Sequence, residues 1–301
     1  MDTNKLKKIA TEARNVLNQG VAQRFLTLGF NPDGSVIEEP VERGGGATFM
    51  GDVVSMDFYH KWMSLKQAVD AKGIAEVVEE AAYTWFNRLV AIRILAKNEL
   101  IAPVLAYESE DVRVPLIVTE ARQGRLPQMD EQTREKLIDL LNDDSRTPDQ
   151  FRMLIVAYCH SHPLINKCFG HISDYTELLL PANILAEGGF VSLLNNTPFI
   201  SEQDFHSPEL IGWLYQFYIA EKKDDVFASF KKGKKAEPKD IPAATQIFTP
   251  NWIVKYMVQN TVGRIYLDNN PWRLRRGCSI WWSRPRSLRP TASSSLMISM
   301  S

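Results

Sequence analysis

Apolar residues recur at helical spacing along most of this 301-residue chain, and this periodicity constrains its fold more than any other feature. One set lies near the start and a longer set follows residue 77: Leu6, Ile9, Ala13, Val16 and Leu17; Val78, Ala81, Trp85, Leu89, Ile92 and Leu95. Side chains three or four residues apart share one face of a helix, which can then be buried. The sequence therefore predicts a mainly α protein.

Three dipeptides, Thr147-Pro148, Ser207-Pro208 and Thr249-Pro250, predict helix starts. In each, the hydroxyl can cap the helix and proline fits its first position. Gln150 is expected to complete a capping box at the first start. Residues 114–120 (VPLIVTE) are the best strand candidate.

Residues 30–52 are rich in turn formers, and we expect a loop there. Its glycines lack the spacing of a nucleotide-binding loop, so we assign it no phosphate site.

Composition favours a soluble protein. The chain has no run of eighteen apolar residues, so we expect no membrane association, and its first residues lack an export signal. Three cysteines, Cys159, Cys168 and Cys278, form no disulfide framework. These features favour the cytoplasm, where thiols stay reduced.

Charge is unevenly distributed along the chain. Residues 273–301 contain six Arg and no acidic residue, so residues 1–272 carry 29 basic against 36 acidic side chains. A body with this excess of about seven negative charges does not attract DNA by its overall charge. The lysine-rich stretch 221–246 is interpreted as a solvated linker, with contact to DNA phosphates as the alternative.

One cluster of potential metal ligands occurs between residues 159 and 171: Cys159, His160, His162, Cys168 and His171. Tetrahedral zinc requires pairs of ligands at short spacing, which Cys168 and His171 with one upstream pair could provide. However, residues 151–160 have the character of a buried helix, in which cysteine is simply a small apolar side chain. We therefore expect no metal site.

Residues 244–268 carry a more specific pattern. Gln246, Phe248, Thr249 and Pro250 match a Gln-x-(Phe/Tyr)-Thr-Pro motif that is followed by an amphipathic helix with Ile253, Val254 and Met257. This stretch resembles motif X of γ-class N6-adenine DNA methyltransferases. The resemblance implies that Gln246, Phe248, Thr249 and Pro250 bind S-adenosylmethionine. Thr249 would cap a helix whose N–H groups favour the cofactor's carboxylate, and the apolar residues would pack against a sheet.

Three upstream stretches extend the resemblance: residues 81–95, 174–185 and 212–227. The first is similar to a helix of large type II restriction–modification polypeptides and of the PglX-like methyltransferases of BREX phage-defence systems. The other two resemble the PglX-like methyltransferases in particular. This family implies DNA as a partner, other defence-system proteins as further partners, and methyl transfer from S-adenosylmethionine to adenine N6.

The chain departs from the family after this motif. We find no glycine-rich motif I, and residues 196–199 and 270–272 only approximate the catalytic (Asn/Asp/Ser)-Pro-Pro-aromatic motif. We therefore assign no catalytic residue, and expect a truncated enzyme, inactive alone, that does not bind the cofactor tightly.

The expected organisation has four parts: a helical N-terminal domain (1–220), a charged linker (221–243), the start of an incomplete α/β methyltransferase domain (244–272) and an out-of-frame, disordered tail (273–301). Two alternatives remain open: a non-catalytic helical module that binds defence partners or DNA, and part of a fused restriction enzyme.

Overall fold

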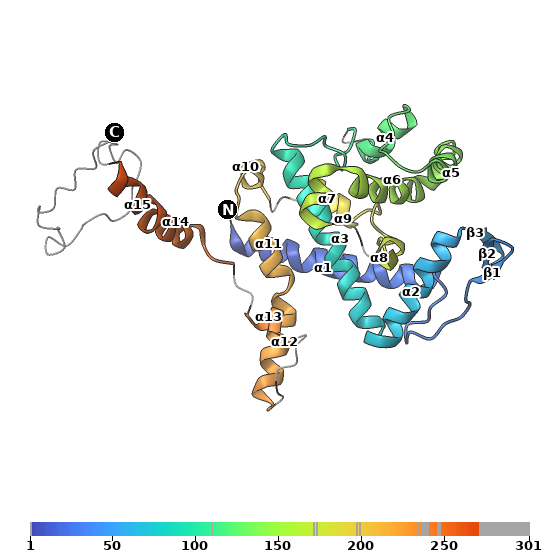
Figure 1. The fold of residues 1–301 in the computed structure, drawn as a ribbon, viewed down its shortest axis with the longest axis horizontal. Helices are drawn as coiled ribbons and strands as arrows, with labels where there is room; N and C mark the ends of the chain where they lie inside the picture. The colour runs from blue at the N-terminus through green and yellow to red at the C-terminus, as the bar shows by residue number, and fades with distance from the viewer. Residues whose placement is uncertain are drawn as a thin grey trace, which may run out of the picture. The chain divides into compact units, whose positions relative to one another are not determined.

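A computed structural model describes residues 2–109, 111–170, 172, 174–196, 198, 200–233, 235, 241–245 and 248–270. The described chain is mostly helical with one small sheet, which confirms the mainly α prediction (Figure 1). It divides into two units, Met1–Phe248 and Thr249–Ser301. Among the described residues, no helix combines the length and apolar character needed to cross a bilayer.

In chain order, the secondary-structure elements are α1 (Thr3–Thr27), β1 (Val41–Arg43), β2 (Gly46–Phe49), β3 (Asp52–Val54), α2 (Met56–Lys72), α3 (Ile74–Lys97), α4 (Leu116–Arg122), α5 (Glu131–Leu141), η1 (Asp144–Arg146), α6 (Thr147–Ser161), α7 (Pro163–Phe169), α8 (Asp174–Leu178), α9 (Phe190–Asn196), α10 (Glu202–Phe205), α11 (Leu210–Tyr218), α12 (Ala220–Lys231), α13 (Ile241–Thr245), α14 (Asn251–Asn260) and α15 (Val262–Asn269).

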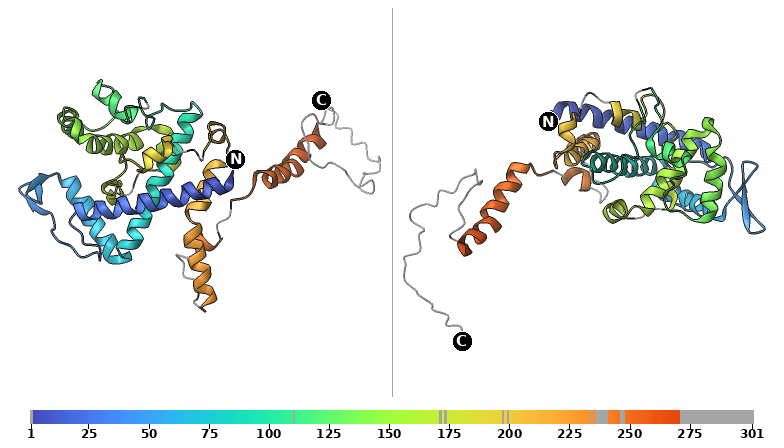
Figure 2. Two further views of the ribbon diagram at one scale, coloured as in Figure 1. Left: turned by 180° about the vertical axis from the view of Figure 1, so that it is seen from behind. Right: turned by 90° about the horizontal axis from the view of Figure 1, so that it is seen from above.

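Helix α1 is the long central element of the first unit. The Asp2 side chain caps it by accepting hydrogen bonds from the N–H groups of Asn4 and Lys5. Its buried face packs mainly against α3 and α11, and Figure 2 shows α1 running through the body beside them. Side chains from α1 to α11 form one continuous apolar cluster. The predicted helical stripes therefore correspond to the core of this unit.

Large aromatic residues join the other helices to this core. Trp62 of α2 is fully buried, stacks on Phe30, and donates an indole hydrogen bond to the carbonyl of Leu28 at 2.8 Å. Trp85 of α3 is also fully buried and donates to the carbonyl of Thr176 at 3.2 Å. Both indole N–H groups thus have partners, as buried polar atoms require.

The prediction of a loop over residues 30–52 is wrong for its second half, where an antiparallel sheet of order β1-β2-β3 forms. The two connections, Gly44-Gly45 and Met50-Gly51, have positive φ at both residues. That geometry is typical of type I′ turns, which match the twist of paired strands. Ala47 and Phe49 of β2 point into the core, but strands of three or four residues show too little alternation to be recognised from sequence.

The strand predicted at 114–120 is also wrong, because Leu116–Arg122 forms helix α4. Pro115 precedes the helix in an extended conformation, as residues before a helix often do. Ile117, Val118 and Ala121 are buried at helical spacing. Burial of this helical face outweighs the preference of Ile and Val for β-strands.

The expected helix starts shift by one or more residues. Helix α6 already includes Thr147, whose hydroxyl donates to the carbonyl of Asp144, and α11 begins only at Leu210. The capping-box role predicted for Gln150 is wrong, since this side chain is fully buried. Its amide donates to the carbonyls of Leu140 and Asp143 at 2.9 and 2.7 Å.

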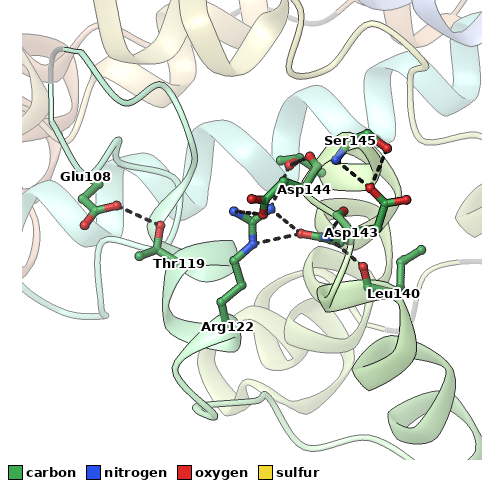
Figure 3. Close-up of polar contacts among 9 residues, drawn as sticks. Glu108, Thr119, Arg122, Leu140, Asp143, Asp144 and Ser145 are labelled. Carbon is green, nitrogen blue, oxygen red and sulfur yellow. Dashed lines mark hydrogen bonds and ion pairs between the residues drawn. The ribbon is translucent and has the colours of Figure 1, made fainter.

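Arg122 completes this network between α4, α5 and α6 (Figure 3). Its guanidinium donates to the Gln150 Oε1 atom at 2.8 and 3.2 Å and forms an ion pair with Asp144. The Gln150 amide thus satisfies two carbonyls at the end of α5 and receives two hydrogen bonds from α4. Because the backbone groups at a helix end lack intrahelical partners, this one side chain closes the corner between three helices.

We predict that Gln150→Met lowers the free energy of unfolding by about 2–4 kcal/mol, because two carbonyls and one guanidinium lose a buried partner. Gln132→Met, at an exposed position of α5, is the matched control and should change the free energy of unfolding by less than about 0.5 kcal/mol. Urea denaturation measures both. Equal effects of the two substitutions would contradict a structural role for the Gln150 network.

Candidate cofactor-binding segment and a charged pocket

The four residues expected to bind the cofactor lie where the first unit ends and the second begins. Gln246 lies outside the described residues. Phe248 is half-buried and is the last residue of the first unit. Thr249 is exposed, and Pro250 is half-buried immediately before α14.

Phe248 contacts α11. Its ring lies directly over Gly212, where an added Cβ atom would be 2.1 Å from the nearest ring carbon. Its backbone N–H donates a hydrogen bond of 3.0 Å to the Gln216 Oε1 atom. We call these two contacts the Phe248 anchor. The chain immediately before Thr249 is therefore attached to the helical body.

The predicted helix after the Thr-Pro dipeptide is confirmed as α14, but the expected cap is wrong. The cap position is occupied by Pro250, whose ψ of 141° is still extended, so that Asn251 is the first helical residue. The N–H groups of Ile253 and Val254 bond to the carbonyl of Pro250. Thr249 lies one residue too early to cap. Pro250 still restricts the chain at this point, because its ring fixes φ.

Helices α14 and α15 expose large apolar side chains. Trp252 and Met257 of α14 are 65% and 57% exposed, and Val262 and Ile265 of α15 are 66% and 64% exposed. Neither helix has a buried residue. An apolar surface of this kind in a soluble protein commonly marks an interface. The apolar face predicted for this segment therefore exists. Among the described residues, however, no sheet covers this face.

A second candidate site is an open pocket of about 490 Å³ between α2, α5, α6 and α8. Glu177 of α8 lies in its wall, where its carboxylate forms an ion pair of 2.6 Å with the Lys61 Nζ atom and lies 2.7 Å from the His160 Nε2 atom. Asp57 pairs with Lys61 on the outer side, and Arg152 also lines the pocket. Acidic and basic side chains both line this pocket, and the mixture of charges defines no ligand class.

The ion pairs shift the pKa values of both central groups. Burial alone would raise the pKa of Glu177, but hydrogen bonds from His160 and Lys61 lower it below its usual range. Burial alone would lower the pKa of Lys61, but hydrogen bonds to Asp57 and Glu177 raise it. Glu177 lies in the short helix α8 (Asp174–Leu178). Its partners are 17 and 116 residues away, and no local pattern links them.

The potential metal ligands do not converge. Cys159 is buried in α6, and burial raises the pKa of its thiol to about 12, which disfavours the thiolate that binds metals. Cys168 is exposed on α7, His160 pairs with Glu177, and His171 lies outside the described residues. Within the part of the chain that the structure describes, no three His, Cys, Asp or Glu side chains are grouped as a metal site.

The two approximate catalytic motifs give no site geometry. Thr197 and Phe199 of the first, and Pro271 and Trp272 of the second, lie outside the described residues, as does the tail 273–301.

This helical body, continued by the Thr-Pro dipeptide and α14, contains the residues on which the resemblance to adenine-specific methyltransferases rests. Comparison with known proteins supports this class. The chain is 35% identical over 282 residues to the adenine-specific methyltransferase BrxX of Escherichia coli O9:H4 (strain HS), and the match covers 90% of the chain. It is 32% identical over 292 residues to the adenine-specific methyltransferase PglX of Lacticaseibacillus casei (strain Zhang), covering 89% of the chain.

These matches confirm the resemblance to PglX-like methyltransferases that the motif residues indicated. The chain spans only 22% and 23% of the length of the two curated relatives. No family model matches the sequence.

We predict that Glu177→Gln lowers the free energy of unfolding by about 1–3 kcal/mol at pH 7, because Lys61 loses its buried charged partner. Since the folded-state pKa of Glu177 is lowered, its contribution is full above pH ~4.5 and disappears as the pH falls through that lowered pKa. The difference between wild type and variant should therefore shrink in acid.

Urea denaturation between pH 3 and pH 7 (conditions spanning the carboxylate range) measures this difference. Asp57→Asn is the control, because its side chain is 71% exposed and its pair with Lys61 is worth little. A Glu177→Gln effect that is independent of pH would show that the carboxylate charge contributes nothing.

Proposed function

We propose that this chain forms the helical body and the first cofactor-binding segment of an adenine-specific DNA methyltransferase of the BrxX and PglX kind. The observation that carries the proposal is similarity along nine tenths of the chain to two proteins of that name. A methyltransferase of this class transfers a methyl group from S-adenosylmethionine to adenine N6, on a base flipped out of the duplex. The substrate of the proposed methyltransferase would be DNA in the cytoplasm.

In this proposal, residues 244–260 contribute one wall of the cofactor pocket. Gln246, Thr249 and Pro250 lie closest to the cofactor, and Phe248 belongs to the same motif. The N-terminal end of α14 carries the positive end of the helix dipole, which favours a carboxylate. The α14 residues Trp252 and Met257 have the exposed apolar surface that a covering α/β sheet would bury.

We further propose that the chain does not methylate DNA alone. Its sequence contains neither a glycine-rich motif I nor an intact (Asn/Asp/Ser)-Pro-Pro-aromatic motif. The side chain and carbonyls of the latter would accept hydrogen bonds from the adenine amino group, and the aromatic ring would stack on the base. The cofactor and the target base would therefore both lack part of their binding sites.

The expected result with purified chain, duplex DNA and radiolabelled S-adenosylmethionine is no incorporation above a sample without DNA. Equilibrium dialysis should likewise detect no tight cofactor binding. Methyl incorporation into DNA that depends on the chain would overturn this part of the proposal. Specific capture of DNA or of a defence protein by residues 1–272, without any methyl transfer, would favour a non-catalytic binding module.

A further inference from the structure

Phe248 belongs to the motif expected to contact the cofactor, yet its ring is occupied elsewhere. The ring covers Gly212 so closely that an added Cβ atom would lie 2.1 to 2.3 Å from three ring carbons. Real Cβ atoms do not approach other atoms this closely, so only glycine permits the contact. Glycine within a helix normally costs stability of about 1 kcal/mol relative to alanine. Its presence in α11 therefore requires a reason, and the ring provides one.

A polar contact lies one helical turn further along the same face. Gln216 follows Gly212 by four residues, so both side-chain positions face the same direction. The Gln216 Oε1 atom accepts the backbone N–H of Phe248 at 3.0 Å. A backbone contact of this kind fixes the main chain as well as the ring. Phe248 is thus attached at two points, one apolar and one polar.

Helix α11 is itself rigidly placed. Leu210, Leu214 and Tyr218 are buried on its opposite side, and the helix packs extensively against α1. The Tyr218 ring lies 4.4 Å from the Phe86 ring between centroids. Movement of α11 would disrupt this core, so the position of Phe248 is set by the body.

The anchor joins parts of the chain that are 32 residues apart in sequence. Between them the chain leaves α11, forms α12 and α13, and returns. Closing a loop of this length costs conformational entropy that only compensating contacts can offset. The next residues after the anchor are Thr249 and Pro250, which continue the proposed cofactor segment into α14.

We propose that Gly212 and Gln216 are positioning residues that bind Phe248 and thereby fix the point at which the cofactor-binding segment leaves the helical body. Phe248 then holds this segment on the helical body through its contact with α11. The inference rests on the proposed function for what the segment does, and on α11 alone for how it is attached.

The polar contact is tested with two variants of the full chain, Gln216→Leu and Gln216→Glu, by hydrogen exchange of the Phe248 amide. Leucine has similar size but no acceptor, so exchange should accelerate about tenfold, the value of one net hydrogen bond. Glutamate keeps an acceptor oxygen and should preserve protection. Exchange in α1, such as at Leu17, should stay unchanged in both and report an intact fold. Equal exchange of the Phe248 amide in both variants and in wild type would overturn the proposal.

The steric contact is tested by a double-mutant cycle of Gly212→Ala and Phe248→Ala. With Phe248 present, Gly212→Ala should lower the melting temperature, because the methyl group displaces the ring. With alanine at 248, the same substitution should raise it, because alanine favours the helix. Gly263→Ala is the matched control in a helix with ordinary spacing around its Cβ position, and Phe248→Ala should leave its effect unchanged.

A Gly212→Ala effect of the same sign and size in both backgrounds would contradict the anchor. Neither experiment uses cofactor or DNA, so their outcome is separate from that of the methyl-transfer assay. Methyl transfer by the chain alone would contradict only the proposed function and would leave the anchor intact. Loss of the anchor in these tests would leave the proposed function intact.

Discussion

Burial of one face of α1 is the interaction on which the rest of the helical body depends. Leu6, Leu17 and Phe25 lie along this face and are almost completely inaccessible to solvent. The face contacts α3 and α11, which are far apart in sequence, and through them the remaining helices. Gly20 brings the backbone of α1 so close to Asn183 that an added Cβ would lie 1.9 Å from its Oδ1 atom. Apolar burial thus defines the body that supports the later segment.

Polar contacts then determine how the outer helices join this core. Gln150 and Arg122 close the corner of α4, α5 and α6, while Glu177 joins α8 to α2 and α6 through Lys61 and His160. Buried polar groups cost free energy when unpaired, so each of these networks specifies one arrangement. The Phe248 anchor likewise specifies the position of the end of the first unit, through the contact of its ring with Gly212 and the hydrogen bond of its backbone N–H.

The fold class was predictable because apolar periodicity reports helix burial directly, as the stripes from Leu6 and Val78 show. The sheet at 41–54 was missed because its strands are too short to alternate, and α4 was mistaken for a strand because burial overrode the propensity of its β-branched residues. The motif at 246–250 was recognisable because its residues are contiguous.

The contacts of the candidate site were not predictable in the same way. Gly212 and Phe248, like Lys61 and Glu177, meet only through the tertiary fold, and neither sequence neighbourhood identifies its partner. Gly212, within a helix of mostly apolar residues, was the local sign of a close approach. The expected cap at Thr249 failed by one residue, because Pro250 remains extended and the helix begins only after it.

We propose that the helical body and the segment after it act together as one part of an adenine-specific methyltransferase. The most direct measurement replaces the matching region of the E. coli BrxX relative with residues 1–268 of this chain and scores adenine N6 methylation of host DNA. We expect methylation by the chimera and none by BrxX lacking the region. A folded, expressed chimera that leaves adenine unmethylated would contradict it.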